Sequence, residues 1–338
     1  MNNSVQDPCT MQMYHGVPMV ALNIISCIFG SIGNVLVCAT IYTTTGLQTI
    51  SNFFLVSMSI ADLTVTLVTQ PLFAWFLGAR IDDKCSPMVE FLFRLFSNVS
   101  CAVSVIHLCL ISVDRCLMVT KPHSFDRIMT KCKFRSLLVF AWTLPIVYAV
   151  LRLTVSKSAT SLFTVAVMAL CYVIIIVCYT LIICQVYKQR RLMRSRQGSA
   201  KRRKSRTDVE RRVAMTIAIV IVVFTICWFP IIYLRSKKAD RNSGVAYNWA
   251  RTFALCNSAM NPWIYCFRIP EFRAGYKRLC IKCSWGTVAG RGGADFDVTH
   301  TSDSEATQYA NIPKYSKVSL ANCKPRENAD EMPKEARI

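Results

Sequence analysis

The stretch LFSNVSCAVSVIHLCLISVDRC, residues 95–116, decides the fold. Its first nineteen residues, Leu95–Val113, carry no charge, and Asp114-Arg115-Cys116 follows at once. Nineteen residues of helix span about 28 Å, which is close to the hydrocarbon thickness of a bilayer. The stretch therefore predicts a membrane-spanning helix with an acid–base pair at its end. Taken alone, Arg115 is either a side chain that anchors the helix at the lipid surface or part of a switch.

The composition extends this prediction to the whole chain. Of its 338 residues, 53% are hydrophobic and 17% are charged, and mean hydropathy is +0.35, which is too apolar for a soluble domain of this size. Lipid forces each apolar segment to satisfy its own backbone hydrogen bonds as a helix. We therefore expect an all-α membrane protein with seven transmembrane helices. The predicted spans are Pro18–Tyr42, Asn52–Leu77, Met88–Thr120, Phe134–Leu153, Ser158–Tyr187, Val209–Leu234 and Val245–Phe267.

Charge predicts the orientation. The formal net charge is +21, of which +10 falls between Lys188 and Arg212, whereas no Lys or Arg precedes Arg80. Basic loops remain in the cytoplasm, so we expect a multi-pass protein with its N-terminus outside and its C-terminus inside. The expected location is the plasma membrane. This rule also accounts for the basic total without nucleic-acid binding.

Four regions follow from the pattern. Residues 1–17 form an extracellular tail with a glycosylation sequon at Asn2, and residues 18–267 form the bundle. Residues 268–283 alternate aromatic and basic side chains, which is typical of an amphipathic helix on the membrane surface. Cys280 and Cys283 in this helix are candidate palmitoylation sites that would anchor it to membrane lipids. Residues 284–338 have the polar composition of a disordered cytoplasmic tail.

Asp62 lies within the second apolar span. A carboxylate at membrane depth is costly, so it should face the bundle interior. Amide and hydroxyl side chains recur at comparable depth, at Asn34, Ser104, Asn257, Ser258 and Asn261. Such oxygens suit Na⁺ or a water network, and the alternative is a hydrogen-bonded cluster that fixes helix packing.

Two later spans contain kink-forming prolines. Phe224, Trp228 and Pro230 lie in the sixth span, and Asn261 and Pro262 lie in the seventh. Each proline removes a backbone hydrogen bond and bends its helix.

Glu210 lies twenty residues before Pro230, about 30 Å along one helix, at the depth of Arg115. An Arg115–Glu210 contact would hold the third and sixth spans together. The alternative is a solvated charge in a basic linker.

Six motifs in the same order and spacing resemble those of the rhodopsin-like (class A) G-protein-coupled receptors. They are Gly33-Asn34-Val35, Leu55 through Asp62-Leu63, Asp114-Arg115-Cys116, Trp142, Cys227-Trp228-Phe229-Pro230 and Asn261-Pro262-Trp263-Ile264-Tyr265. The resemblance implies a receptor that binds an extracellular ligand and activates a heterotrimeric G protein by outward motion of its sixth helix. It implies no enzyme activity.

The resemblance also implies roles for single residues. Asp62, Ser104, Asn257 and Asn261 match a pocket for an allosteric sodium ion, and no other cofactor is expected. Trp228 matches a toggle tryptophan. Arg115 matches the arginine that engages the G protein once it is freed from Asp114 and Glu210. Tyr179 and Tyr265 match tyrosines that hold the active state.

This chain departs from the family pattern at its outer end. The family joins its third helix to the second outer loop by a disulfide, but here Glu90 occupies the helix position and the loop has no Cys. Cys85, five residues earlier, has Cys9 as its alternative partner. Cys171 also replaces a proline in the fifth span. In these departures from the family pattern, the chain is most similar to the melanocortin, lysophospholipid, cannabinoid and adenosine receptors.

Two residues that other receptor classes use to bind their ligands are missing here, which narrows the chemical class of the expected ligand. Ser97 stands where amine receptors have an Asp, and the seventh span lacks the Lys to which opsins attach retinal. Arginines near the outer helix ends favour an anionic lipid, a carboxylate or a nucleotide, unless they only bind headgroups. Glu90 would equally attract a basic peptide. The predicted pocket residues are Arg94, Ser97, Asn98, Cys101, Ile231, Arg235, Tyr247 and Arg251.

The remaining predicted sites are Ser and Thr side chains on the cytoplasmic side that could be phosphorylated. Ser205 lies in a basic kinase-like context, and a second cluster comprises Thr299, Thr301, Ser302 and Ser304. Once phosphorylated, this cluster would bind arrestin.

A seven-helix transporter or channel with Asp62 as a relay is the alternative function. It is disfavoured because the sequence has neither a second buried acid nor an inverted repeat.

Overall fold

The computed structural model describes residues 9–154, 157–194, 201–236 and 244–289, and within them no side chain is described at 152–154, 157–165, 168, 190, 192–194, 201–211, 214, 235–236 and 282–289. These residues are almost entirely helical. The helices are α1 (Met13–Thr43), α2 (Ile50–Thr64), α3 (Gln70–Ile81), α4 (Pro87–Thr120), α5 (Phe125–Ile128), α6 (Lys131–Thr154), α7 (Lys157–Arg194), α8 (Lys201–Ser236), α9 (Val245–Arg268) and α10 (Pro270–Ala289), with a 3₁₀ turn η1 (Thr45–Leu47) and a π-helical turn η2 (Val65–Thr69).

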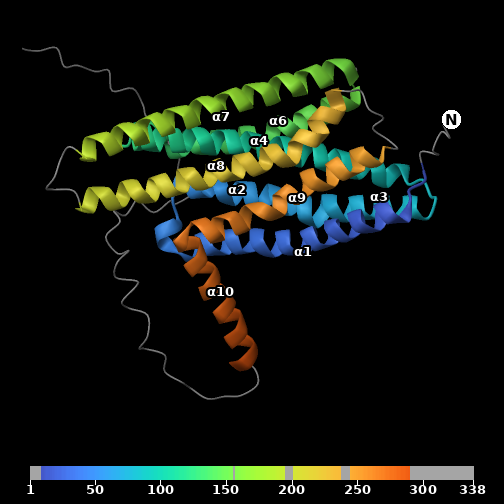
Figure 1. Ribbon diagram of the computed structural model, residues 1–338, viewed down its shortest axis with the longest axis horizontal. Helices are drawn as coiled ribbons and strands as arrows, with labels where there is room; N and C mark the ends of the chain where they lie inside the picture. The colour runs from blue at the N-terminus through green and yellow to red at the C-terminus, as the bar shows by residue number, and fades with distance from the viewer. Residues whose placement is uncertain (1–8, 155–156, 195–200, 237–243, 290–338) are drawn as a thin grey trace, which may run out of the picture.

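The long helices run side by side as a bundle (Figure 1). Six spans within the described residues are long and apolar enough to cross a membrane: Met13–Thr43, Ile50–Ile81, Pro87–Thr120, Lys131–Leu151, Ala169–Gln189 and Met215–Leu234. The more polar α9 packs against α1 and α8 and completes a bundle of seven. Large apolar side chains such as Ile25, Val147 and Ile226 are more than half exposed on the outside of the bundle, as expected of a surface solvated by lipid.

Several helices extend beyond the approximate limits predicted for the spans, such as α8, which begins at Lys201 rather than Val209. The first helix begins at Met13 rather than Pro18, so Pro18 lies inside α1, in its second turn. The terminal helix α10 runs from Pro270 to Ala289, six residues beyond the predicted end at 283, since adding residues to an existing helix is easy. It leaves the bundle at a steep angle, at the end opposite the start of α1 (Figure 1). These two ends are called the α10 end and the α1 end below.

Glycine brings α1 into close contact with α9. A Cβ atom on Gly30 would lie 2.9 Å from the Cβ of Ala259, and one on Gly33 would lie 2.8 Å from the Cβ of Pro262. This approach allows the Asn34 Nδ2 to donate to the Ser258 carbonyl at 3.1 Å. Pro262, four residues after Ser258, has no N–H to bond that carbonyl, so an amide of α1 supplies the missing donor.

The second span is not one regular α-helix. Between α2 and α3, the N–H of Gln70 bonds the carbonyl of Val65, five residues back, which defines the π-helical turn η2. Pro71 follows at the start of α3 and cannot donate to a carbonyl in the preceding turn. The missing N–H of Pro71 therefore falls next to the wider turn, where the regular α-helical hydrogen bonds are already interrupted. This turn lies close to Asp62 in the sequence.

The segment before α1 is tied to the α1 end of the bundle. Cys9 forms a disulfide with Cys85, and their Cα atoms lie 5.1 Å apart. The backbone N–H of Met11 donates to the Arg80 carbonyl at 2.9 Å, and the Met11 side chain joins a buried cluster with Phe73 and Phe93. Residues 9–11 therefore form a lid that is continuous with the core.

Replacing Cys9 and Cys85 together by Ser should lower the melting temperature of the solubilised protein. A link across 76 residues restricts the unfolded chain by about 4 kcal/mol in the loop-entropy account. Thermal unfolding followed by a thiol-reactive dye measures the effect. Cys132→Ser, at an exposed free cysteine, is the matched control. Equal melting of the double variant and the control would contradict a stabilising role.

Candidate functional site

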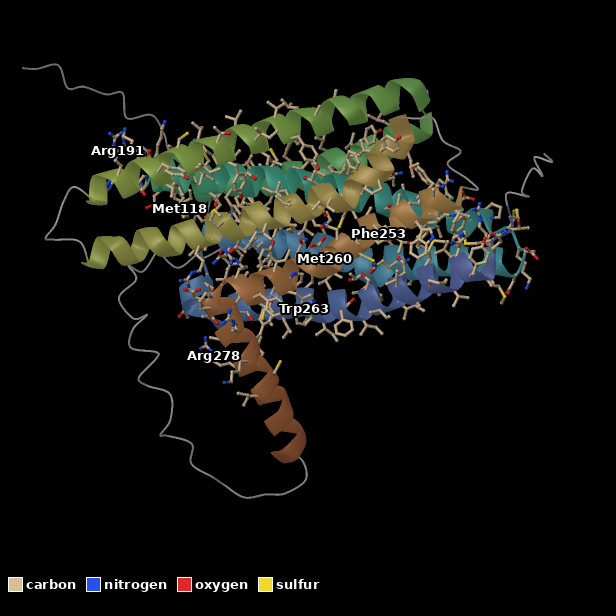
Figure 2. All side chains as sticks on the ribbon, viewed as in Figure 1. Met118, Arg191, Phe253, Met260, Trp263 and Arg278 are labelled. Atoms are coloured by element: carbon tan, nitrogen blue, oxygen red, sulfur yellow. A yellow bond between two sulfur atoms is a disulfide. The ribbon has the colours of Figure 1, made fainter. Side chains whose placement is uncertain are left out.

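A cavity of about 180 Å³ opens among α4, α6, α7, α8 and α9 at the α1 end of the bundle. Its walls are mainly apolar, with Phe93, Leu144 and Ile232 among them, and the exposed Phe253 and Met260 mark the opposite, outward face of α9 (Figure 2). Apolar walls with a few converging polar groups are typical of small-ligand sites.

Most of the predicted pocket residues meet in this cavity. They are Arg94, Ser97, Asn98, Cys101, Ile231, Tyr247 and Arg251. The side chain of Arg235 lies outside the described residues. Tyr148 and Pro145 of α6 also line the cavity, although no sequence pattern pointed to them.

Two guanidinium groups supply the cavity's positive charge. The Arg251 guanidinium carbon lies 4.3 Å from the centre of the Tyr247 ring and 5.4 Å from that of Phe93, and its Nη1 donates to Asn248 Oδ1 at 3.4 Å. Arg94 forms an ion pair with Glu90, one turn earlier on α4. Glu90 itself does not line the cavity, and its attraction for a basic peptide is weakened by Arg94. Within the described residues, the lining contains no carboxylate.

Trp228 forms the boundary between this cavity and a smaller polar cavity beneath it. The Trp228 ring stacks on Phe224 at 5.6 Å and lines both spaces, together with Ser97 and Cys101. Pro230 lies two residues later inside α8. The lower cavity continues to Ser104, Asn257 and Ser258. Trp228 therefore lies where the ligand-sized space meets the buried polar centre.

Asp62 lies in this polar centre and is 1% exposed. Its Oδ2 accepts a hydrogen bond from Asn261 Nδ2 at 2.9 Å, and the hydroxyls of Ser104 and Ser258 face the same carboxylate. The second carboxylate oxygen of Asp62 and the side-chain oxygens of Asn257 and Asn261 have no protein hydrogen-bond partner. A charged oxygen beside neutral ones is a donor set that fits Na⁺. When bound, the ion would neutralise the carboxylate.

Asp62→Asn should remove sodium sensitivity. In membranes, basal nucleotide exchange by the wild type should fall when Na⁺ replaces N-methylglucamine, because an ion bound at Asp62 would favour the inactive state. The variant lacks the charge that holds the ion, so its exchange rate should be the same in both salts. Asp114→Asn, a buried carboxylate outside this centre, should keep the sodium effect. A persistent effect in Asp62→Asn would place the ion elsewhere.

The acid–base pair lies at the α10 end of α4. Arg115 is 6% exposed, and its Nε lies 3.9 Å from Asp114 Oδ2. Its Nη2 donates to Asn52 Oδ1 of α2 at 3.3 Å, and its Nη1 lies 4.0 Å from the sulfur of Met118. Arg115 is therefore held inside the bundle rather than anchored in lipid headgroups. The side chain of the other predicted partner, Glu210, lies outside the described residues.

Both predicted tyrosines lie near Arg115. Tyr179 on α7 and Tyr265 on α9 are close enough for electrostatic interaction with its guanidinium. The Tyr265 ring also packs against Phe272 of α10 at 6.0 Å. The structure thus gathers residues of α2, α4, α7 and α9 around one arginine.

Sequence reasoning missed a second buried polar network. The Trp142 N–H donates to Ser57 Oγ at 3.0 Å, and Ser57 lies 2.8 Å from His107 Nε2, whose other ring nitrogen faces the Val103 carbonyl. Because the Val103 carbonyl only accepts, His107 carries its proton on Nδ1. The network joins α2, α4 and α6 around the fully buried His107, and the sequence had indicated only Trp142, as one of the family motifs.

Several predicted modification sites lie outside the described residues. These are Asn2, the side chains of Ser205 and Cys283, and the tail hydroxyls Thr299, Thr301, Ser302 and Ser304. Cys280 is a free, exposed cysteine on α10.

Comparison with known proteins identifies the family. The family model of the seven-transmembrane receptors of the rhodopsin family matches residues 33–162 and 154–265. The crystal structure of squid rhodopsin has a TM-score of 0.70 at 19% identity, covering 94% of this chain and 99% of that one, which shows the same fold.

Curated relatives are receptors. The histamine H2 receptor of Cavia porcellus is 26% identical and covers 82% of this chain and 83% of its own length. Melanocortin receptor 4 of Danio rerio is 26% identical, with coverages of 76% and 81%. Octopamine receptor beta-2R of Chilo suppressalis is 23% identical, with coverages of 85%. The chain therefore belongs to the rhodopsin family of seven-transmembrane receptors, and it is a G-protein-coupled receptor rather than an enzyme or transporter.

Proposed function

We propose that this receptor responds to an extracellular ligand with an anionic group on an apolar body. The observation that carries the proposal is the cavity lining, which has Arg94 and Arg251 but no carboxylate among its described residues. A ligand anion would lie between two guanidinium groups, which bind carboxylate and phosphate through paired hydrogen bonds. The apolar walls would bury the rest of the molecule.

Arg251 is the stronger of the two anchors in this proposal. Its guanidinium is packed against two aromatic rings, which hold it in place so that little entropy is lost when a ligand binds. The charge of Arg94 is partly neutralised by Glu90. A lysophospholipid-like, carboxylate or nucleotide ligand would each satisfy this geometry.

An amine ligand is the alternative that the names of two relatives raise. One is called a histamine receptor and another an octopamine receptor. Amine recognition needs a negative partner for the ammonium, and here Ser97 occupies the corresponding wall position. Two neighbouring guanidinium groups would repel an ammonium. The cavity therefore supports an acidic ligand over an amine.

Arg251→Ala should weaken the response to an acidic agonist by roughly 30- to 700-fold. Removing one partner of a buried charge pair costs about 2–4 kcal/mol, and about 1.4 kcal/mol is tenfold in affinity. A panel of lysophospholipids, carboxylates, nucleotides, amines and basic peptides is titrated in a G-protein activation assay. Lys84→Ala, which removes an exposed charge near the same end, is the control.

Two results would overturn the proposal. One is an amine agonist whose potency is unchanged or improved by Arg251→Ala. The other is an acidic agonist whose potency falls equally in Lys84→Ala, since that would trace the effect to surface charge alone.

We further propose how binding reaches the G protein. The ligand would contact Trp228 at the cavity floor and favour a state in which α8 swings outward at Pro230 and Arg115 becomes accessible. The order of the cavity, Trp228, the Asp62 centre and Arg115 along the bundle supports this path. In this proposal the cavity opens outside the cell, and α10 lies on the cytosolic side of the plasma membrane. Basic loops at the α10 end and the Cys9–Cys85 disulfide at the other support that orientation.

Modifications follow from this orientation. Asn2 would carry a glycan, Cys280 and Cys283 would carry palmitoyl chains, and the phosphorylated tail would bind arrestin.

The orientation can be tested with antibody epitopes. An epitope placed before Asn2 should be accessible on intact cells, whereas one placed after Ile338 should require permeabilisation.

A further inference from the structure

A second set of uncharged polar side chains is buried between α1, α3 and α9, nearer the α1 end than Asp62. We call it the α1–α3–α9 polar cluster. All its members are at most 8% exposed, and four of them have no exposed surface at all. The cluster consists of Asn23, Ser26, Thr69, Gln70, Asn248 and Thr252.

Hydrogen bonds within the cluster connect the three helices. Asn23 Nδ2 donates to the Met19 carbonyl at 2.8 Å and to Thr252 Oγ1 at 3.3 Å. The Thr252 hydroxyl donates to the Asn248 carbonyl at 3.0 Å. Gln70 Nε2 donates to Ser26 Oγ at 2.8 Å. These bonds fix which atom of each amide points into the cluster.

Four polar atoms remain without a protein partner after these bonds are made. They are Asn23 Oδ1, Thr69 Oγ1, Gln70 Oε1 and Asn248 Nδ2. A buried polar atom with no hydrogen bond costs about 1–3 kcal/mol. Four such atoms in one cluster would cost a large part of a protein's net stability.

The residues that carry the unpartnered atoms are linked through neighbouring members of the cluster. Asn23 contacts Thr252, which is one helical turn from Asn248 on α9. Ser26, the partner of Gln70, is one turn from Asn23 on α1, and Thr69 precedes Gln70 in the chain. A helical turn rises about 5.4 Å, so neighbouring members on one helix are about one turn apart.

The chemistry of the four atoms selects the occupant. Amide and hydroxyl oxygens need a hydrogen-bond donor, whereas the Asn248 amide nitrogen needs an acceptor. A water molecule donates two hydrogen bonds and accepts two. A cation would meet the Asn248 N–H and no carboxylate among the cluster residues, so its desolvation would be uncompensated. We propose that the α1–α3–α9 polar cluster binds a buried structural water.

The proposed water has a consequence for the neighbouring cavity. Asn248 Oδ1 accepts a hydrogen bond from Arg251 Nη1 at 3.4 Å. A water on Asn248 Nδ2 would hold the amide with its oxygen toward Arg251. The cluster therefore adjoins the cavity through one amide group, whatever the chemical class of the ligand.

Met19 provides a built-in reporter for this water. It lies one turn before Asn23, and its side chain is fully buried, so radicals from bulk solvent cannot reach it. X-ray radiolysis generates hydroxyl radicals from bound water as well as from bulk water, and thioethers are oxidised readily. In the wild-type receptor in lipid nanodiscs, brief irradiation should produce Met19 sulfoxide. Met13, which is 67% exposed, is the internal standard for dose.

The test compares matched variants by mass spectrometry. The pair Asn23→Leu and Gln70→Leu should reduce Met19 oxidation to the level of unirradiated protein and leave Met13 oxidation unchanged. The pair Ser31→Ala and Thr66→Val removes two hydroxyls that bond each other directly at 3.0 Å, so it should leave Met19 oxidation intact.

Two results would overturn the proposal. One is a wild-type receptor in which Met13 is oxidised and Met19 is not. The other is a folded Asn23→Leu and Gln70→Leu receptor that oxidises Met19 as the wild type does. The first comparison needs no variant, so a variant that fails to fold does not weaken the test.

Discussion

Arg115→Ala should abolish ligand-stimulated nucleotide exchange on the G protein while leaving surface expression at the wild-type level. The reason is geometric. Arg115 is held inside the α10 end of the bundle by Asp114 and by Asn52, and its charge is available to a partner only after these contacts break. Removing the side chain removes the group that the proposed active state presents. The substitution also removes the positive charge next to the buried carboxylate of Asp114, which can destabilise the fold. Ligand binding therefore checks that the variant is folded.

Purified receptor in nanodiscs with purified G protein is the system for this measurement. Lys121→Ala removes an exposed cation at the end of α4 and should retain exchange. Agonist binding by Arg115→Ala should persist, because the cavity is at the other end of the bundle. Normal exchange by Arg115→Ala would show that another group engages the G protein.

Gly30→Val should prevent most of the receptor from reaching the cell surface. Even the first added carbon would lie 2.6 Å from Thr66 Cγ2 and 3.1 Å from the backbone Cα of Ala259. Overpacking of this kind lowers the stability of the folded state by about 1–3 kcal/mol or more. Here the backbone of α9 must also move to make room for the added side chain. Moving α9 away from α1 would also break the bond from Asn34 to the Ser258 carbonyl.

A matched glycine provides the control. Gly78 lies within α3, and a Cβ atom added to it would meet no neighbouring atom within 4 Å, so Gly78→Val should reach the surface normally. The milder Gly30→Ala should be rescued by Thr66→Ser together with Ala259→Gly, since these remove the contacting methyl groups. Normal surface expression of Gly30→Val would mean that α1 and α9 are not packed this closely.

The sequence predicted the parts of this fold that depend on apolar length and on costly residues. Seven spans are evident because lipid requires long apolar helices. The grouping of Asp62 with Asn261 follows because a buried carboxylate needs a donor, and the structure has their side chains 2.9 Å apart. Arg94 and Arg251 were expected in the pocket because both lie near the outer ends of their predicted spans, and both line the cavity.

Other features depend on tertiary contacts that leave no local signal. Asn52 is an ordinary polar residue near the start of α2, and only the packing of α2 against α4 makes it the partner of Arg115. Likewise nothing distinguishes Ser57 in the sequence until His107 and Trp142 converge on it. Cys85 has sixteen other cysteines in the chain, and its pairing with Cys9 depends on the path of residues 9–11 over the bundle.

The π-helical turn at Val65–Thr69 has a consequence for evolution and for alignment. A π turn holds one residue more than an α turn, so every side chain after it is rotated by about 100° from where an unbroken α-helix would point it. Thr69 and Gln70 face the bundle core only in this register. A relative with a regular helix here would need a single-residue gap to align correctly. Substitutions transferred from such a relative to α3 without that gap would alter the wrong face of the helix.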